Sequence, residues 1–175
     1  MTNAIAISEL DEEGALDALG GLSCVLHDCV AAGASVSFMW PFEIAEAHAY
    51  WRGIAEAVRD KRTSLFVAVS DGAIAGTVQL GLDGPCNQKH RGEIRKLLVL
   101  RSARRLGIAR ALMLHAEERA RASGLTLLTL DTATGGSAEA LYRNLGWQEV
   151  GVIPRYAKWP DGRYCDTTVF FKPIG

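Results

Sequence analysis

Apolar side chains recur along the chain with two different periods, and the period distinguishes helices from strands. Spacings of three and four residues predict four amphipathic helices, at residues 8 or 11 to about 32, 41 to about 61, 107–123 and 137–145. Short apolar or alternating runs bounded by turn residues predict seven strands, at residues 4–8, 65–70, 73–82, 92–100, 126–131, 148–153 and 164–172. Asp71-Gly72, typical of a tight hairpin, joins the second strand to the third.

The order of these elements, β-α-α-β-β-β-α-β-α-β-β, predicts an α+β protein with a mixed sheet flanked by helices. In the clearest helix, 107–123, the inner face carries Ile108, Leu112, Ala116 and Ala120. Glu117 is expected to pair with Arg121 on the outer face of the same helix.

Length and composition place the chain among soluble globular proteins. Its 175 residues contain no repeat or linker, which predicts one domain, 1–175. The apolar share is 49% and the charged share 22%, values that exclude collagen-like, disordered and fibrous proteins. No apolar run is long enough to cross a bilayer, and the acidic start lacks the basic region of a signal peptide. We expect a cytoplasmic protein without a membrane partner.

The net charge of −1 conceals an uneven distribution. Ten acidic and two basic residues give residues 1–60 a local charge of −8, while eight basic residues and Glu93 give residues 89–110 a charge of +7. This division predicts one surface for an anion and another for a cation. The alternative is two solvated faces that never meet the same ligand.

Cysteine and histidine give no indication of a metal site. Cys24, Cys29, Cys86 and Cys165 form no C-x-x-C pair, and the four histidines are scattered singly. Zinc sites need clustered ligands, so we expect no metal and reduced thiols.

The basic segment contains the most informative pattern, a strand that leads through a short loop into the helix 107–123. A helix N-terminus presents unpaired N–H groups to an anion. We therefore expect the residues of this loop to bind phosphate: Arg104, Arg105, Leu106, Gly107, Ile108, Ala109 and Arg110. The loop fits neither G-x-G-x-x-G nor G-x-x-x-x-G-K-[ST], which argues against dinucleotide and nucleoside triphosphate sites. A solvated helix start is the alternative.

Arg104-x-x-Gly107-x-Ala109 resembles the [QR]-x-x-G-x-[GA] loop of the GCN5-related N-acetyltransferase (GNAT) superfamily. The resemblance implies a mixed, mostly antiparallel sheet splayed around acetyl-CoA, with the pyrophosphate on this loop. It further implies cofactor contacts at Ser137 and along the strand Leu97, Leu98 and Val99, whose backbone N–H groups would polarise the acetyl carbonyl. Dimers are common among such proteins, so a homodimer is possible.

A narrower resemblance extends over several short segments, 33–39, 130–132, 136–140 and 160–163. They are similar to the tabtoxin-resistance acetyltransferases and related enzymes that acetylate antibiotics and toxins. Residues 40–42 and the surroundings of Trp147 depart from that pattern, in regions where the acceptor would be selected.

Acetyl transfer to an amine calls for a base and for an acid that protonates the leaving thiolate. Glu93 is the lone acid of the basic segment, at a position where the resemblance implies a general base; the alternative is an ion pair with Arg91 or Arg95. Alternation places Glu93 on one face with Arg95 and Leu97. Asp131 is a second candidate base that would also hold the acceptor, or else caps a loop.

Two further features complete the expected chemistry. The resemblance implies that Tyr142 is the acid, whereas a packed aromatic is the alternative. Neither Cys86 nor Cys165 belongs to a local histidine-bearing motif of an acyl-carrying thiol, so we expect direct transfer.

The acceptor wall is expected to combine aromatic and acidic residues. Phe38 and Trp40, with Phe42, Trp51 and Trp159, form either an apolar floor or part of the core. Glu43, Glu46 and Asp83 either attract a cationic acceptor or are ordinary surface charges.

These observations predict an acetyl-CoA-dependent N-acetyltransferase for a small amine. The acidic first third favours an aminoglycoside, and the narrower resemblance favours a tabtoxinine-like β-lactam. A peptide or protein N-terminus, a CoA-binding regulator without catalysis, and a nucleic-acid module using residues 89–110 remain alternatives. The last is disfavoured because no aromatic residues are interleaved with the bases.

Overall fold

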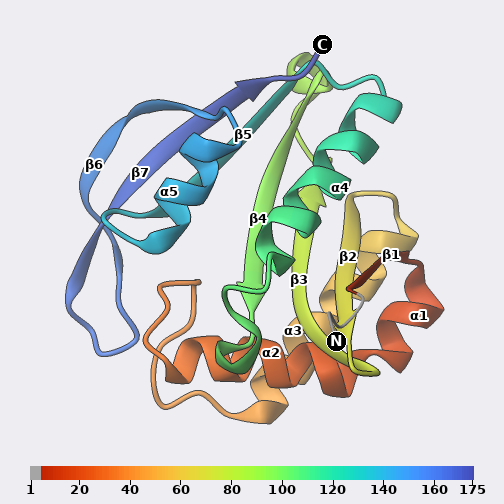
Figure 1. Cartoon of the computed structure of the whole chain (residues 1–175), viewed down its shortest axis with the longest axis vertical. Helices are drawn as coiled ribbons and strands as arrows, with labels where there is room; N and C mark the ends of the chain where they lie inside the picture. Colours follow the sequence, from red (N-terminus) through yellow and green to blue (C-terminus); the bar gives the residue numbers. More distant parts are fainter. Residues whose placement is uncertain (1–4) are drawn as a thin grey trace.

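The computed structural model describes residues 5–175, which form a mixed sheet with helices on both faces (Figure 1). The strands are β1 (Ala6–Leu10), β2 (Thr63–Ser70), β3 (Ala73–Gly81), β4 (Arg91–Val99), β5 (Leu127–Ala133), β6 (Gln148–Lys158) and β7 (Tyr164–Pro173). Their order across the sheet is β1-β2-β3-β4-β5-β7-β6, and the β4–β5 pair is parallel, whereas the other pairs are antiparallel. The predicted α+β class with a mixed, mostly antiparallel sheet is confirmed.

Helices cover the two faces of the sheet unequally. They are α1 (Glu12–Asp17), α2 (Leu19–Ala31), α3 (Ile44–Arg59), α4 (Ile108–Ala122) and α5 (Ser137–Asn144), with short 3₁₀ turns at Cys86–Gln88 and Arg101–Ala103. One core joins α4 and α5 to the sheet through Phe66, Leu112 and Phe170. The core on the opposite face joins α1, α2 and α3 to it through Leu26, Trp51 and Val67.

The first predicted helix is wrong in one respect, because the chain forms two helices that meet at Ala18. The break precedes Gly20 and Gly21, and glycine has a low helix propensity. A Cβ on Gly21 would lie 2.9 Å from Ile74 Cδ1, so this glycine lets α2 approach β3 closely.

Other boundaries differ by a few residues. The strand predicted at 4–8 is β1, which runs on to Leu10, and Ala4 lies outside the described residues. Helix α3 begins three residues later than predicted, where the Glu46 carboxylate accepts a hydrogen bond of 2.9 Å from the Glu43 N–H. Strand β6 continues past Pro154, where the prediction ended, because β6 is an edge strand and proline is tolerated at a sheet edge.

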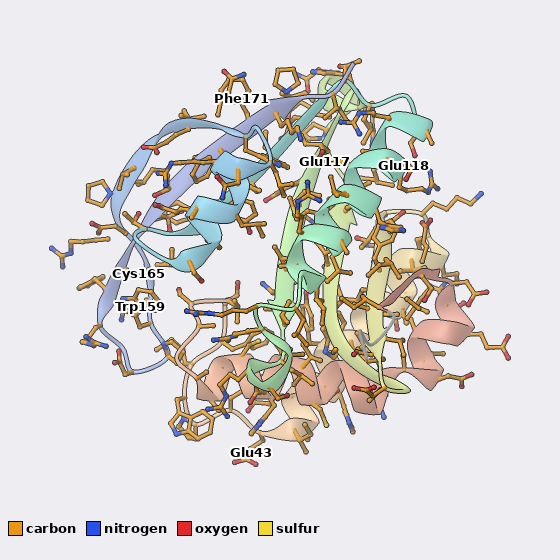
Figure 2. All side chains as sticks on the ribbon, viewed as in Figure 1. Glu43, Glu117, Glu118, Trp159, Cys165 and Phe171 are labelled. Atoms are coloured by element: carbon orange, nitrogen blue, oxygen red, sulfur yellow. The ribbon has the colours of Figure 1, made fainter. Side chains whose placement is uncertain are left out.

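The expected pair of Glu117 with Arg121 is present, but the expectation that Glu117 lies on the outer face of its helix is wrong. Its side chain is 1% exposed, and Figure 2 shows it on α4 with the neighbouring Glu118 turned outward. The carboxylate accepts hydrogen bonds from Lys172 Nζ at 2.6 Å and Trp147 Nε1 at 2.9 Å, and Arg121 lies 3.5 Å away. Glu117 therefore ties α4 to β7 from inside the molecule.

We expect Glu117→Gln to destabilise the fold, because the Lys172 ammonium, whose side chain is only 16% exposed, would lose its counter-charge. Removing one partner of a buried ion pair costs about 3–5 kcal/mol. Urea unfolding would measure the loss, and the exposed Glu118→Gln is the matched control. Equal unfolding free energies for the two variants would contradict this role of Glu117.

Candidate active site

Strands β4 and β5 start side by side and then separate. They pair only from Arg91 to Glu93 on β4 and from Leu127 to Thr129 on β5, and Figure 1 shows them diverging beyond this point. Past Glu93, the β4 backbone groups that face β5 have no strand partner among residues 5–175. The opened sheet borders a cavity of about 510 Å³, which is lined by both strands, by residues 35–39, by α5 and by β6.

A bulge in β4 changes which side chains enter this cavity. Opposite β3, Thr77 pairs with Leu98 and Gln79 pairs with Arg95, so β4 contains one extra residue here. Lys96 lies at the bulge with φ +50°. Ile94 packs on the α4 face, whereas Leu98 packs on the α2 and α3 face. The expected alternation holds for Glu93 and Arg95, which are in contact, but it is wrong for Leu97, which packs against the core on the α4 face because the extra residue reverses the alternation.

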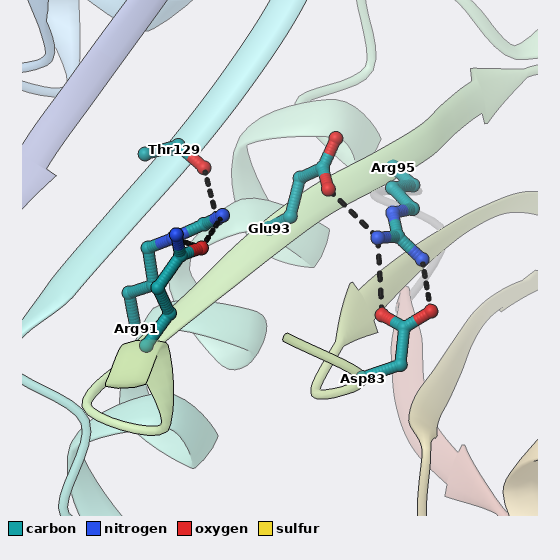
Figure 3. A network of polar contacts seen from close by, with 6 residues as sticks. Asp83, Arg91, Glu93, Arg95 and Thr129 are labelled. Carbon is teal, nitrogen blue, oxygen red and sulfur yellow. Dashed lines mark hydrogen bonds and ion pairs between the residues drawn. The ribbon is translucent and has the colours of Figure 1, made fainter. Parts of the chain in front are cut away.

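Glu93 lies at the last paired position of β4, at the base of the cavity, and is bound to Arg95. Arg95 Nη2 lies 2.7 Å from Glu93 Oε2 and 3.0 Å from Asp83 Oδ1, so one guanidinium bridges two carboxylates (Figure 3). The ion pair considered as an alternative for Glu93 is present with Arg95. Arg91 instead donates to Thr129 Oγ1, at 3.4 Å.

Asp131 enters the same cavity from β5, two residues beyond the last β4–β5 pair. Its side chain is open to solvent through the cavity mouth, yet nearby protein atoms partly desolvate the carboxyl group. This burial raises the pKa of Asp131, and the negative charge of Glu93 raises it further, while Lys96 opposes the shift. A carboxylate with a raised pKa is a better proton acceptor than an ordinary aspartate.

Tyr142 reaches the cavity from α5, with only 5% of the residue exposed. Its ring packs against Trp147 and Phe170, at centroid distances of 6.1 and 5.8 Å. Burial, followed by the charge of Asp131, raises the pKa of the Tyr142 hydroxyl well above its ordinary range. The hydroxyl therefore stays protonated at neutral pH, as an acid must before it acts.

The phosphate-binding candidates lie beside the cavity, between β4 and α4. Gly107 precedes α4 with φ +83° and has no side chain that caps the helix, so the first N–H groups of α4 face outward. Arg104, Arg105 and Arg110 are exposed around it. Arg101 anchors the start of this loop, because Asp28 of α2 binds its guanidinium at 2.7 Å. The donor set suits a phosphate or pyrophosphate group.

The structure brings together only some of the predicted site residues. The cavity between β4 and β5 is lined by Glu93, Asp131, Tyr142, Leu97 and Phe38. Leu98 is buried in the core, Val99 ends β4, and Ile108 is buried at the start of α4. Among the remaining loop residues, Leu106 is exposed and Ala109 half-buried, and Ser137 begins α5 as an exposed residue.

The other predicted acceptor residues lie elsewhere. Trp40 and Trp159 line a separate cavity of about 410 Å³ between the end of α2 and the β6–β7 turn. Phe42 and Trp51 are buried in the core. Glu43 lies before α3 and lines neither cavity (Figure 2).

No acid of residues 5–60 lines the larger cavity, whose acids are Glu93 and Asp131. The prediction that the acidic first third forms the wall for a cationic acceptor is therefore wrong for this cavity. Several of those acids instead pair with neighbouring arginines, as Glu9 does with Arg119 and Glu12 with Arg59.

Sequence reasoning missed several polar residues of the cavity, among them Ser37, Tyr50, Lys96 and Lys158. One signal was present. Arg95 and Lys96 are consecutive cations in a strand with a buried face, and regular alternation would bury one of them. A bulge that lets both side chains line the cavity, away from the packed core, resolves this conflict.

Residues 5–175 contain no group of three or more histidine, cysteine, aspartate or glutamate side chains placed to hold a metal ion. Within the same range no helix combines the length and apolarity that a membrane crossing requires. Neither Cys86 nor Cys165 lines the larger cavity.

Known proteins match the chain in sequence and in fold. The profile of the acetyltransferase (GNAT) family matches residues 31–147. An uncharacterised N-acetyltransferase of Azospirillum brasilense, from the hisH–hisA intergenic region, is 38% identical over 106 residues, which are 59% of this chain and 61% of that protein. The alignment thus spans less than two thirds of that relative.

Two solved structures share the fold over nearly the whole chain. A ribosomal-protein-alanine N-acetyltransferase from Brucella melitensis superposes with a TM-score of 0.80 at 24% identity, covering 96% of this chain and 99% of its own. A phosphinothricin acetyltransferase from Sinorhizobium meliloti, in complex with acetyl-CoA, gives 0.79 at 21% identity, with coverages of 100% and 90%. The family profile spans most of the chain, and these structures share its fold. The chain therefore belongs to the acetyltransferase (GNAT) family, whose members are acyltransferases that use acetyl-CoA.

Proposed function

We propose that this protein transfers the acetyl group of acetyl-CoA directly to a primary amine of a small molecule, an antibiotic or a toxin. The observation that carries the proposal is the convergence of two carboxylates and a protonated tyrosine in one cavity. Asp131, Glu93 and Tyr142 come from β5, β4 and α5, and they meet where the sheet opens.

Acetyl-CoA supplies an activated thioester, and this chain supplies the groups around it. The α4 N-terminus with Arg104, Arg105 and Arg110 would bind the pyrophosphate. The backbone N–H groups of residues 97–99, where β4 has left β5, would donate to the acetyl oxygen and polarise the carbonyl. Ser137, at the start of α5, is a further candidate contact.

The carboxylates divide the work on the acceptor. Asp131 would hold the acceptor ammonium and take its proton, because its raised pKa suits proton transfer. Glu93, bound by Arg95, would add negative charge to the same side of the cavity. Tyr142 would give its proton to the departing sulfur.

The cavity lining favours one of the two small-amine classes over the other. An aminoglycoside rests on the acidic first third of the chain, and no acid of residues 5–60 lines the cavity. A tabtoxinine-like β-lactam stays supported by the matched short segments, which include the Asp131 strand end and the start of α5.

Two further observations support a cellular compartment and an oligomeric state. Cys24 and Cys86 are exposed free thiols, which suits a reducing compartment such as the cytoplasm. Edge strand β6 exposes Val150, Val152 and Ile153, and a homodimer would cover them.

Calorimetry with acetyl-CoA tests the proposal first, and a panel of amines monitored by CoA release tests it second. We expect acetyl-CoA to bind at micromolar to tens of micromolar concentration and at least one class of small amine to be acetylated. Absence of binding would contradict the proposal. Acetylation of peptide N-termini alone would reassign the acceptor, and binding without any turnover would indicate a regulator.

We expect Gly107→Ala to weaken acetyl-CoA binding about tenfold or more. Gly107 has φ +83°, a conformation that costs alanine about 1–2 kcal/mol. A Cβ here would meet no protein atom within 4 Å, so it would point into the space offered to the phosphates. Calorimetry measures the effect, and Gly124→Ala, with φ +76° at the far end of α4, carries the same backbone cost. Equal affinities in the two variants would contradict the placement of the pyrophosphate.

A further inference from the structure

The bulge in β4 directs an additional cation into the cavity. Arg95 already bridges Glu93 and Asp83, so its charge is matched within the protein. The next residue, Lys96, also lines the cavity, but it forms no ion pair with a carboxylate among residues 5–175. Its charge therefore remains available to a ligand.

Neutral groups hold the Lys96 ammonium in place. Nζ donates to Ser37 Oγ at 3.1 Å and lies 5.8 Å from the ring centre of Phe38 and 5.9 Å from that of Tyr50. Tyr50 is fixed in turn, because Gln79 Nε2 donates to its hydroxyl at 2.9 Å. Aromatic faces and one hydroxyl orient a cation without neutralising it.

The cavity thus has two chemical sides. Its acids are Glu93 and Asp131, and its cations other than Arg95 are Lys96 and Lys158. Burial lowers the pKa of Lys96, which shows that its charged form is short of solvation. An anion beside Nζ would relieve that shortage, and the Asp131 side would still be available to an ammonium.

We propose that Lys96 binds an anionic group of the acceptor, a carboxylate or a phosphinate, and so selects acceptors that carry both an amine and an anion. This assignment rests on the proposed function, since it takes the amine to lie at Asp131. Lys96 is then a specificity-determining residue, and Lys158 adds positive charge from β6.

The test compares acceptors in pairs: L-α-amino acids, each with the amine of the same side chain that lacks the carboxylate. Lys96→Met keeps the apolar stem that packs near Phe38 and Tyr50, whereas Lys96→Arg keeps the charge. We expect the wild type to prefer the amino acid of each accepted pair. Lys96→Met is expected to raise KM for that amino acid about tenfold to hundredfold, the usual cost of losing a hydrogen bond to a charged group.

Three comparisons isolate the role of the charge. KM for the carboxylate-free amine is expected to change much less than KM for the amino acid in Lys96→Met, because Lys96 reaches the amine only through its charge effect on Asp131. Lys96→Arg is expected to retain most of the preference. Lys89→Met, an exposed lysine outside the cavity, is the matched control. An equal rise in KM for both members of a pair would show a packing role only and would overturn the assignment, as would a wild type that prefers the amines.

A binding measurement separates this assignment from the proposed function. Calorimetry on the CoA complex compares an N-acetyl amino acid with the N-acetyl amine that lacks its carboxylate, and it requires no turnover. Tighter binding of the N-acetyl amino acid, abolished in Lys96→Met, would support Lys96 even if no amine were acetylated. Equal binding of the two compounds, or binding of neither, would overturn the assignment even if amines were acetylated.

Discussion

Replacing Tyr142 with phenylalanine is expected to lower kcat by about 10²–10⁴-fold, the usual contribution of a positioned acid. Acetyl-CoA affinity is expected to change little, because the phosphate-binding loop lies on another element, at the start of α4. The acceptor KM should also change little, since the substitution removes one hydroxyl and leaves the ring.

The environment of Tyr142 makes this expectation specific. Its ring is fixed between Trp147 and Phe170, and phenylalanine would retain these contacts. Helix α5 is also anchored independently, because Thr168 Oγ1 of β7 donates to Glu139 Oε1 at 2.5 Å. The loss in the variant therefore reports the hydroxyl itself.

Steady-state kinetics and calorimetry on the same preparations give the two values. Tyr164→Phe is the control, because Tyr164 is exposed on β7 and lines neither cavity. A variant that keeps its kcat but binds acetyl-CoA weakly would assign Tyr142 to cofactor packing instead of acid catalysis.

Asp131→Asn is expected to lower kcat/KM by about 10²-fold or more and to remove a limb of the pH profile. A base acts in its ionised form, so wild-type kcat/KM should fall as the pH falls through the raised pKa of Asp131. Asparagine has no proton to lose, so the variant should show a low rate without this limb.

The same substitution is expected to stabilise the free protein at neutral pH. The pKa of Asp131 is higher in the folded protein than its ordinary value of 3.8, mainly because of burial and then because of Glu93. Folding therefore favours the protonated form, and that stabilisation is complete below pH 3.8 and is lost as the pH rises through the raised pKa. Neutral asparagine avoids the loss, so the two proteins should differ in stability at neutral pH and converge in acid.

Kinetics across pH and urea unfolding at two pH values check both consequences. Glu93→Gln under the same conditions shows which carboxylate controls the pH limb, and the exposed Asp17→Asn controls for a surface aspartate. A pH limb that persists in Asp131→Asn and disappears in Glu93→Gln would move the base to Glu93.

Periodicity alone predicted most of the fold. Helix α4 follows its expected inner face, with Ile108, Leu112, Ala116 and Ala120 all buried. The errors arose where tertiary contacts override local pattern. Gly21 packs against Ile74 close to the break between α1 and α2. Pro154 has no backbone N–H to donate, and an edge strand such as β6 tolerates this loss. Glu117 looked like a surface residue because its partner Lys172 is distant in sequence.

The candidate site was predicted in part, for a similar reason. The basic loop and the carboxylates can be read from short motifs, whereas the wall of the cavity comes from segments far apart in the chain. Ser37, Tyr50 and Lys96 meet only after folding, and the bulge that turns Lys96 inward depends on pairing with β3. The net charge of residues 1–60 wrongly predicted an acidic wall for the same reason. Several of these acids pair with arginines outside the cavity, as Glu9 does with Arg119 and Glu12 with Arg59.

The central claim is that the opening between β4 and β5 is the place where the acetyl group is transferred. The most direct measurement is a crystal structure of the CoA complex, read as the distance from the CoA sulfur to the Tyr142 hydroxyl. The account predicts hydrogen-bond contact between them, with the pyrophosphate on the amides that precede α4. A sulfur outside this cavity, distant from both Tyr142 and Asp131, would contradict it.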